Sequence, residues 1–190
     1  MHGMKVSRMR EELADREAIR DCIYRYCRAI DRCDFDLLET IYWPEATEDH
    51  APFKGSAADF MAWARTMLVP MDQTQHFVGN ILIRIDGAFA YVETYIRAHH
   101  RLHGANDSRF DLVTSGRYVD RMERRDDEWR ILSRTVVRDW FRQYPDSADW
   151  EEGVFGTPFQ PGLRNGSDPS YELLNFTVEN QSQGGQPSRI

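Results

Sequence analysis

The sequence predicts an α+β domain in which three N-terminal helices cover one face of a strongly curved, mostly antiparallel sheet. Two observations lead to this prediction. The first third of the chain repeats apolar residues with the period of a helix, whereas four long β-rich runs follow residue 73. Turn sequences separate the first pair and the last pair of these runs. A curved sheet covered on one side by helices leaves a conical cavity, where a small ligand can bind.

The first predicted helix spans residues 7–33, with Ser7 capping its start. Its apolar stripe follows the spacing i, i+3, i+4, i+7, i+8 and i+11 and consists of Ile19, Cys22, Ile23, Tyr26, Cys27 and Ile30. Asp31 lies at the edge of this stripe. Its carboxylate is therefore expected beside the core and not in open water.

Two shorter helices are expected next. The second runs from Asp34 to about Tyr42 and is ended by Trp43-Pro44, because a proline disfavours helix at the preceding residue. Residues 45–55 are expected to form a short strand and turn. Ser56 then caps a third helix over residues 57–68, which closes before Pro70.

The strands are expected over residues 74–85, 88–103, 110–124 and 128–143, with turns at Asp86-Gly87 and at residues 125–127. From about Pro145 the chain is rich in Gly, Pro, Ser, Asn and Gln. We therefore expect a domain of residues 1–145 and an extension of residues 146–190. Its apolar islands (Val154-Phe155, Phe159 and 171–176) should pack over the cavity mouth or on a neighbouring subunit, and residues 180–190 should be disordered.

Composition narrows the function classes. A net charge of −7 with scattered basic residues argues against nucleic acid as a partner. No apolar run approaches the roughly 20 residues that cross a membrane, and the N-terminus lacks the apolar stretch of a secretion signal. Cys22, Cys27 and Cys33 suit neither a zinc site nor a disulfide framework, so we expect three reduced thiols in a cytoplasmic protein.

Asp31 and His76 are the most informative pair of residues. An acid is a poor choice near a helix C-terminus, where the dipole favours cations, so Asp31 needs another reason to be there. Holding an imidazolium is such a reason. A carboxylate that orients an imidazole can move a proton at neutral pH without a metal or cofactor. The alternatives are a structural histidine at a strand end and an aspartate that caps a loop or pairs with Arg28 or Arg32.

Residues from about 11 to 144 resemble the SnoaL-like branch of the nuclear-transport-factor-2 superfamily, which has a cystatin-like fold and includes scytalone dehydratase and bile-acid 7α-dehydratase. Four stretches carry the resemblance. They are Ala-Ile-Arg (18–20) through Tyr26 to Asp31 and on to Phe-Asp-Leu-Leu (35–38), Gln-His-Phe-Val-Gly-Asn (75–80), Ile-Arg-Ala-His-His (96–100), and Trp-Arg-Ile-Leu (129–132) leading to Arg138.

The resemblance implies that Asp31 and His76 form a catalytic dyad, with Tyr26 and Arg138 around the substrate. His100 matches a second pocket histidine, and the remaining substrate-binding candidates are Asn80, Tyr24 and Trp140.

This chain also departs from its relatives. It has Ile30 where scytalone dehydratase has a tyrosine, and Thr114, Ser115 and Arg117 near the position of a pocket asparagine. It has Tyr26 where hexachlorocyclohexane dehydrochlorinase has a lysine. Scytalone and chloride elimination are therefore disfavoured.

Other readings of these residues stay open. Tyr26 lies in the apolar stripe and could be a core aromatic. A buried Arg138 would need an anionic partner, and Asp139 should face the opposite side of its strand. His99 and His100 also face opposite sides, and His100 lies on the less polar face. Because these two rings diverge, no metal site is predicted. His50 and His103 are expected in surface loops.

The sequence therefore predicts a cofactor-independent lyase for a small, largely apolar ring compound such as a steroid, terpenoid or aromatic catabolite. The same dyad could run an isomerisation, a cyclisation or a retro-aldol loss of formaldehyde. The alternatives are a ligand-binding protein and a non-catalytic subunit that resembles the β subunit of ring-hydroxylating dioxygenases. The resemblance also implies a homo-trimer or homo-dimer built on the outer sheet face.

Overall fold

The computed structural model describes residues 2–150, 152–158, 160 and 162–174. The elements are α1 (His2–Arg32), α2 (Phe35–Glu39), β1 (Tyr42–His50), β2 (Phe53–Ser56), α3 (Ala57–Leu68), β3 (Gln73–Asp86), β4 (Phe89–His103), η1 (Ala105–Asp107), β5 (Arg109–Arg125), β6 (Glu128–Pro145), η2 (Val154–Gly156) and α4 (Pro169–Leu174).

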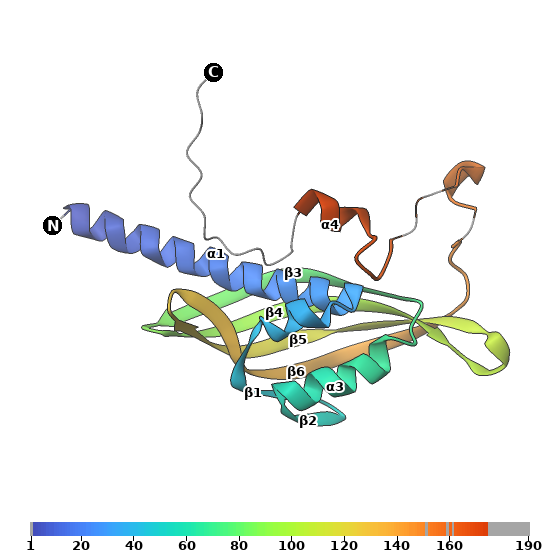
Figure 1. Cartoon of the computed structure of the whole chain (residues 1–190), viewed down its shortest axis with the longest axis horizontal. Coiled ribbons are helices and arrows are strands. Elements are labelled where there is room, and N and C mark those ends of the chain that lie inside the picture. The colour runs from blue at the N-terminus through green and yellow to red at the C-terminus, as the bar shows by residue number, and fades with distance from the viewer. Residues whose placement is uncertain (1, 151, 159, 161, 175–190) are drawn as a thin grey trace, which may run out of the picture.

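Six strands form one sheet in the order β2-β1-β6-β5-β4-β3. All neighbouring strands are antiparallel except β1 and β6, which are parallel. Helix α1 runs along β3 at one edge, and α3 lies against β1 and β2 at the other (Figure 1). The sequence prediction of an α+β fold with a mostly antiparallel sheet is therefore confirmed.

Helix α1 begins earlier than predicted. It starts at His2, so Ser7 is not its cap; inside the helix, the Ser7 hydroxyl donates to Glu11 Oε1 at 3.0 Å. The N-terminal end of α1 projects beyond the sheet (Figure 1). The second half carries the predicted stripe, in which Ile19, Cys22 and Ile23 are fully buried. Burial raises the pKa of the Cys22 and Cys27 thiols to about 12.

Helix α2 ends at Glu39, so the predicted end near Tyr42 is wrong. Tyr42 pairs with Ile131 of β6 instead, and Trp43-Pro44 continues into β1. The proline is tolerated because the β1–β6 register shifts between Tyr42 and Thr47, where the ladder makes no use of its missing N–H.

The cap of α3 and the hairpin turns are as predicted. The Ser56 hydroxyl accepts a hydrogen bond from the Asp59 backbone N–H at 3.1 Å, and α3 ends before Pro70. Between β3 and β4 the chain turns at Gly87 with φ +61°. Asp126 and Asp127 have φ of 48° and 65°, which suits a tight two-residue hairpin between β5 and β6.

The core contains a fully buried ion pair. The Arg134 guanidinium donates to both carboxylate oxygens of Asp120 at 2.7 and 2.8 Å. The same guanidinium lies 4.0 Å from the Tyr26 ring centroid and 4.1 Å from that of Tyr118. This bidentate pair joins β5 and β6 beneath Tyr26 of α1.

The tail packs through polar contacts more than through the predicted apolar islands. Phe155 is 99% exposed, so the predicted packing of this residue is wrong. Tyr171 does pack, because the Arg28 guanidinium lies 4.5 Å from its ring centroid and its hydroxyl donates to Asp34 at 2.8 Å. Phe159, Phe176 and residues 180–190 lie outside the described residues.

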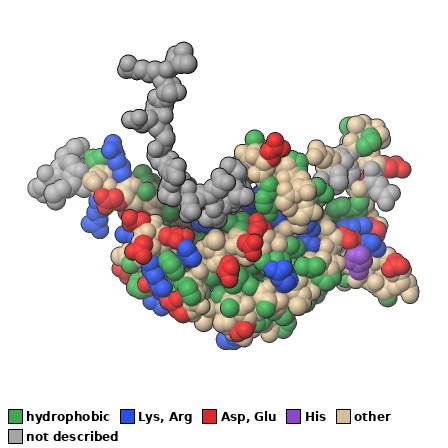
Figure 2. Space-filling model, viewed as in Figure 1, with side chains coloured by type: hydrophobic (Ala, Val, Ile, Leu, Met, Phe, Trp, Pro, Cys, Tyr) green, Lys and Arg blue, Asp and Glu red, His purple; other side chains and the backbone are tan. Residues whose placement is uncertain are grey.

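Acidic and basic side chains are interspersed on the face drawn in Figure 2. In the described part of the chain no helix has the length and apolar character needed to cross a membrane.

Candidate functional site

A cavity of about 400 Å³ lies between helices α1 and α3 and the inner face of the sheet. Helices α1 and α3 and strands β4, β5 and β6 supply its mostly apolar wall, which includes Ile30, Phe60, Leu68, Ile96, Leu112 and Val136. Its volume is within the range of pockets that hold small organic ligands.

Asp31 and His76 meet at this cavity. Asp31 Oδ1 is 2.8 Å from His76 Nδ1, and Asp31 Oδ2 accepts a hydrogen bond from the His76 backbone N–H at 2.8 Å. Only 12% of the Asp31 side chain and 8% of the His76 side chain are exposed. One carboxylate thus fixes both the backbone and the ring of His76.

This arrangement also selects the tautomer of the neutral imidazole. A carboxylate accepts hydrogen bonds, so the proton of a neutral His76 lies on Nδ1. Nε2 makes no hydrogen bond with any described residue, and the ring lines the cavity. The dyad therefore presents a basic nitrogen to whatever fills the cavity.

His100 lies beside the dyad. Its ring centroid is 5.8 Å from that of His76, with the two planes at 84°. Burial, with a smaller contribution from His76, lowers the pKa of His100 to about 4. At neutral pH the ring is therefore uncharged. Its Nδ1 is buried and has no hydrogen-bond partner within the described residues.

Tyr26 belongs both to the core and to the cavity wall. It packs edge-on against Tyr118 and Tyr42, with centroids 5.4 and 6.2 Å away. Burial and the nearby Glu48 carboxylate raise its pKa, so the phenol keeps its proton and can donate a hydrogen bond.

Arg138 lies on the cavity rim and is not buried, which corrects one expectation from the sequence. It needs no anionic partner, because its guanidinium donates to the carbonyls of Ala51 at 2.5 Å and His50 at 3.4 Å. Asp139 forms an ion pair with Arg117 at 3.5 Å.

Tyr24, Asn80 and Trp140 lie outside this cavity, so the structure does not support their predicted contact with a ligand there. Tyr24 is two residues from Tyr26, about 200° around the helix, and is 51% exposed. Asn80 is exposed where the β3–β4 register shifts between Val78 and Ile81.

Trp140 turns outward because of a bulge. Gly116 pairs with Arg138, but the preceding residue of β5, Ser115, pairs with Trp140, so β6 carries one extra residue. The side-chain alternation reverses there. Arg138 and Phe141 consequently line the cavity, and Trp140 lies under the Arg97 guanidinium at 5.3 Å on the other side.

His50 is the histidine that the sequence interpretation misplaced. It ends β1, lines the cavity and stacks on Phe60, with ring centroids 5.2 Å apart. Its Nδ1 is 3.1 Å from Oε1 of Glu48. The available signal was the alternation Ala46, Glu48, His50, which places three side chains on one strand face. His103 is exposed, as predicted, but it ends β4 and does not lie in a loop.

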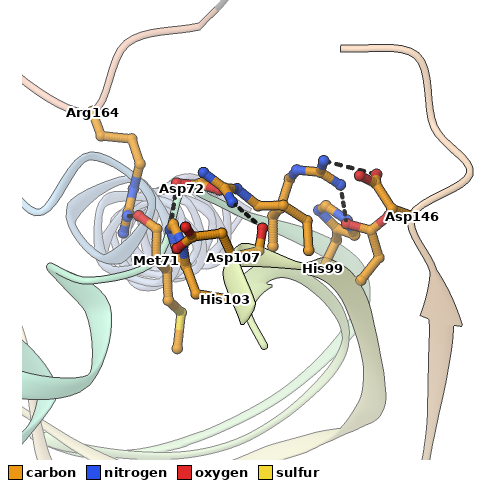
Figure 3. Close-up of polar contacts among 10 residues, drawn as sticks. Met71, Asp72, His99, His103, Asp107, Asp146 and Arg164 are labelled. Carbon is orange, nitrogen blue, oxygen red and sulfur yellow. Dashed lines mark hydrogen bonds and ion pairs between the residues drawn. The ribbon is translucent and has the colours of Figure 1, made fainter. Parts of the chain in front are cut away.

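Sequence reasoning also missed Arg164, a lone arginine in the Gly- and Pro-rich tail. Its guanidinium donates to the carbonyls of Asp31 at 3.3 Å, Leu68 at 2.9 Å and Met71 at 2.5 Å. Figure 3 shows Arg164 reaching from the tail towards Met71. One tail residue therefore joins the ends of α1 and α3 next to the dyad.

Charged residues surround this end of the molecule. Asp72, which follows Met71, pairs with His103 at 2.7 Å and with Arg109 at 2.6 Å (Figure 3). His99 turns away from the cavity, as predicted, and bonds to Asp111 at 3.1 Å. Among the described residues, no group of three or more His, Cys, Asp or Glu could hold a metal ion.

The sequence profile of the SnoaL-like domain matches residues 11–135. An uncharacterised protein of Mycobacterium tuberculosis H37Rv is 28% identical over 130 residues, which cover 67% of this chain and 87% of that protein.

Solved structures of low sequence identity share the fold. One is a hexachlorocyclohexane dehydrochlorinase (TM-score 0.67, 18% identity, 75% of this chain and 97% of that one). Another is a Novosphingobium aromaticivorans protein provisionally named a scytalone dehydratase (TM-score 0.63, 20% identity, 72% and 92%). A third, from Nostoc punctiforme, is a protein of unknown function with a cystatin-like fold (TM-score 0.55, 15% identity, 66% and 91%).

Proposed function

The chain belongs to the SnoaL-like domain family, and from that premise we propose that it is a cofactor-independent lyase. Its substrate is a small, largely apolar ring compound, from which it eliminates water. The observation that carries the proposal is the 2.8 Å contact between Asp31 Oδ1 and His76 Nδ1 at an apolar cavity of about 400 Å³.

In the proposed mechanism, His76 Nε2 removes a proton from a carbon next to a carbonyl or a similar activating group. The Asp31 carboxylate stabilises the imidazolium that forms, and general base catalysis of this kind contributes roughly 10²–10⁴-fold. The departing hydroxyl then receives the proton from the His76 imidazolium. The substrate leaves as an unsaturated product and water, and His76 returns to its neutral form.

His100 and Tyr26 serve as hydrogen-bonding groups in this scheme. A histidine with a pKa of about 4 carries no acidic proton to spare at neutral pH, so His100 orients the leaving hydroxyl and does not protonate it. The protonated Tyr26 phenol can donate to the oxygen on which negative charge develops. Arg138 contributes only from the rim, since solvent screens an exposed guanidinium.

The same proton transfers would also begin an isomerisation, a cyclisation or a retro-aldol loss of formaldehyde. Elimination is favoured because His76 can serve as both base and acid while His100 is free to hold a leaving hydroxyl. A non-catalytic subunit would need no cavity in which Asp31 and His76 meet, so the observed cavity counts against that alternative.

The test is a product screen with β-hydroxy ketones of steroid, terpenoid and fused aromatic skeletons, followed by mass spectrometry. We expect loss of water from at least one class, and the loss should be abolished in His76→Gln. A product of unchanged mass would indicate isomerisation, and loss of formaldehyde would indicate retro-aldol cleavage. If the wild-type protein converts none of these compounds, the lyase proposal is wrong.

A further inference from the structure

A second histidine–carboxylate pair faces the same cavity, on the side away from the dyad. Glu48 of β1 has a completely buried side chain, and its Oε1 is 3.1 Å from Nδ1 of His50. Its other oxygen, Oε2, accepts a hydrogen bond from the Tyr42 hydroxyl at 2.9 Å. A buried carboxylate is costly unless its oxygens are satisfied, and here both are.

Glu48 sets the tautomer of neutral His50, just as Asp31 sets the tautomer of neutral His76. Burial and the Glu48 carboxylate raise the pKa of Tyr42, so the phenol remains the donor of its hydrogen bond to Oε2. The carboxylate therefore accepts from Nδ1–H of His50 as well. In the described part of the chain Nε2 of His50 makes no hydrogen bond, and the ring lines the cavity.

Two further contacts hold His50 in place. Its ring stacks on Phe60 of α3, with centroids 5.2 Å apart and planes at 23°. Arg138 of β6 donates to the carbonyls of His50 and Ala51, which fixes the end of β1. Glu48 and Arg138 are thus positioning residues for an imidazole that points into the cavity.

The two imidazoles come from separate regions of the sheet. In the order β2-β1-β6-β5-β4-β3, His50 lies on β1 and His76 on β3, with three strands between them. Those intervening strands contribute apolar groups to the cavity (Ile96, Leu112 and Val136) and also the polar side chains of His100, Thr114 and Ser115. The mostly apolar cavity therefore carries a carboxylate-bound histidine on β1 and another on β3.

We propose that His50 is a second substrate-binding residue of this cavity, which hydrogen-bonds an oxygen at the far end of the substrate. The inference rests on the proposed function at His76 and deepens it by defining the substrate class. The substrate is a rigid, mainly apolar ring compound with oxygen functions at two separated positions. Neutral Nε2 accepts a hydrogen bond from a hydroxyl, and the imidazolium donates one to a carbonyl.

The test compares ligands that differ by one oxygen. The probes are androsterone, with a hydroxyl and a ketone at opposite ends, against androstanone without the hydroxyl, and a naphthalenediol against naphthol. Binding is measured by isothermal titration calorimetry. We expect the wild-type protein to bind the two-oxygen member of at least one pair roughly tenfold more tightly, since one hydrogen bond is worth about that factor.

His50→Phe is the decisive variant, because phenylalanine keeps the stacking on Phe60 and removes both nitrogens. The two-oxygen preference should disappear in His50→Phe and persist in the control His103→Phe, an exposed histidine outside the cavity. A preference that survives in His50→Phe overturns the inference, and so does failure of both two-oxygen probes to bind the wild-type protein.

A second measurement avoids dependence on a variant that could fold poorly. In ¹⁵N-labelled wild-type protein, the Nε2 resonance of His50 should shift with the two-oxygen probe and not with its one-oxygen partner. An unchanged resonance with a bound two-oxygen probe overturns the inference. The lyase proposal fails separately. Probe binding that depends on His50, with no conversion of any β-hydroxy ketone in the product screen, would remove only the lyase proposal. Turnover of a β-hydroxy ketone that depends on His76 and is indifferent to His50→Phe would remove only this inference.

Discussion

At the scale of single residues, Asp31 does two jobs with one carboxylate, since its oxygens bind the ring and the backbone N–H of His76. Asp31→Asn keeps the size of the side chain but can present an N–H to Nδ1. This would favour the wrong tautomer of His76 and remove the charge that stabilises its imidazolium. We expect kcat for the substrate found in the screen to fall by roughly 10²–10⁴-fold, measured by initial rates.

The control for Asp31→Asn is the thermal unfolding temperature, because Asp31 is buried and its replacement could act through stability. If the fraction of unfolded variant is too small to explain the fall in kcat, the fall is due to the loss of proton transfer at His76. Activity within twofold of the wild type would contradict the role of Asp31.

His100 gives a prediction about pH. Its pKa is about 4 in the folded protein, against 6.5 for a free imidazole, chiefly because it is buried. Between these values the unfolded chain binds more protons, so stability must fall as the pH drops from 6.5 towards 4. The full shift corresponds to about 3 kcal/mol of unfolding free energy.

Urea unfolding at pH 7 and pH 4.5 measures this loss. In His100→Gln, which cannot titrate, the part of the loss due to His100 should be absent. The titratable groups that act on its ring are His76, Asp31 and His99, and they remain in the variant. Identical pH dependence in both proteins would show that His100 is not held neutral by the fold.

The sequence was sufficient to predict that Asp31 and His76 come together, because each lies in a stretch that resembles the family. It was not sufficient for His50, since the prediction placed β1 too late and treated its end as a loop. Arg164 could not be found from pattern at all. Three of its contacts are to backbone carbonyls, which any residue type can supply, and the other two are to Cys33 Sγ and Thr74 Oγ1, which lie far from it in the sequence.

At the scale of elements, the β5–β6 bulge decides which side chains reach the cavity. A Cβ at Gly116 would lie 2.0 Å from the backbone oxygen of Val137, so no other residue fits without moving β6. We expect Gly116→Ala to lower the unfolding free energy by about 2 kcal/mol or more, measured by urea denaturation. Gly166→Ala is the matched control, because nothing lies within 4 Å of its added Cβ.

Strands and turns were predicted well because their signals are local. Alternating residues and the Asp-rich and Gly-containing turns fixed the four long strands to within about two residues. The bulge near Asp139 depends on the pairing of two strands, which no single stretch reveals. Trp140 was therefore placed on the wrong face.

The tail and the helix ends are joined through Arg164. Its guanidinium satisfies carbonyls at the C-terminal ends of α1 and α3, where helical partners are missing and the dipole favours a cation. We expect Arg164→Ala to cost about 1–3 kcal/mol of unfolding free energy. Hydrogen exchange should increase in residues 68–74 and 163–174 while the β4–β5 hairpin stays protected.

The control for this variant is Arg10→Ala, since Arg10 is an exposed residue near the start of α1. Equal stability of the two variants would mean that the tail contributes nothing to the helix ends.

At the scale of the whole molecule, the sheet has one covered face and one open face. The cavity and both long helices occupy the inner face, while Tyr91, Tyr95 and Val119 are each about two-fifths exposed on the other. Arginines lie over several rings of these strands, as with Arg84 and Tyr91 at 4.4 Å. Partly exposed aromatics flanked by arginine are typical of protein interfaces.

Val119 tests whether this open face joins copies of the chain, as the resemblance implies. It follows Tyr118, which lines the cavity, so its own side chain must point outward.

We expect light scattering of the wild-type protein to give two or three times the 22.3 kDa chain mass, and Val119→Glu to return it to 22.3 kDa. Replacing an apolar side chain by a carboxylate that the contact between subunits would bury carries a large desolvation cost. Val6→Glu, at a similarly exposed valine of α1, should leave the mass unchanged. A wild-type mass of 22.3 kDa would instead mean that the outer face stays open and that the cavity is complete within one chain.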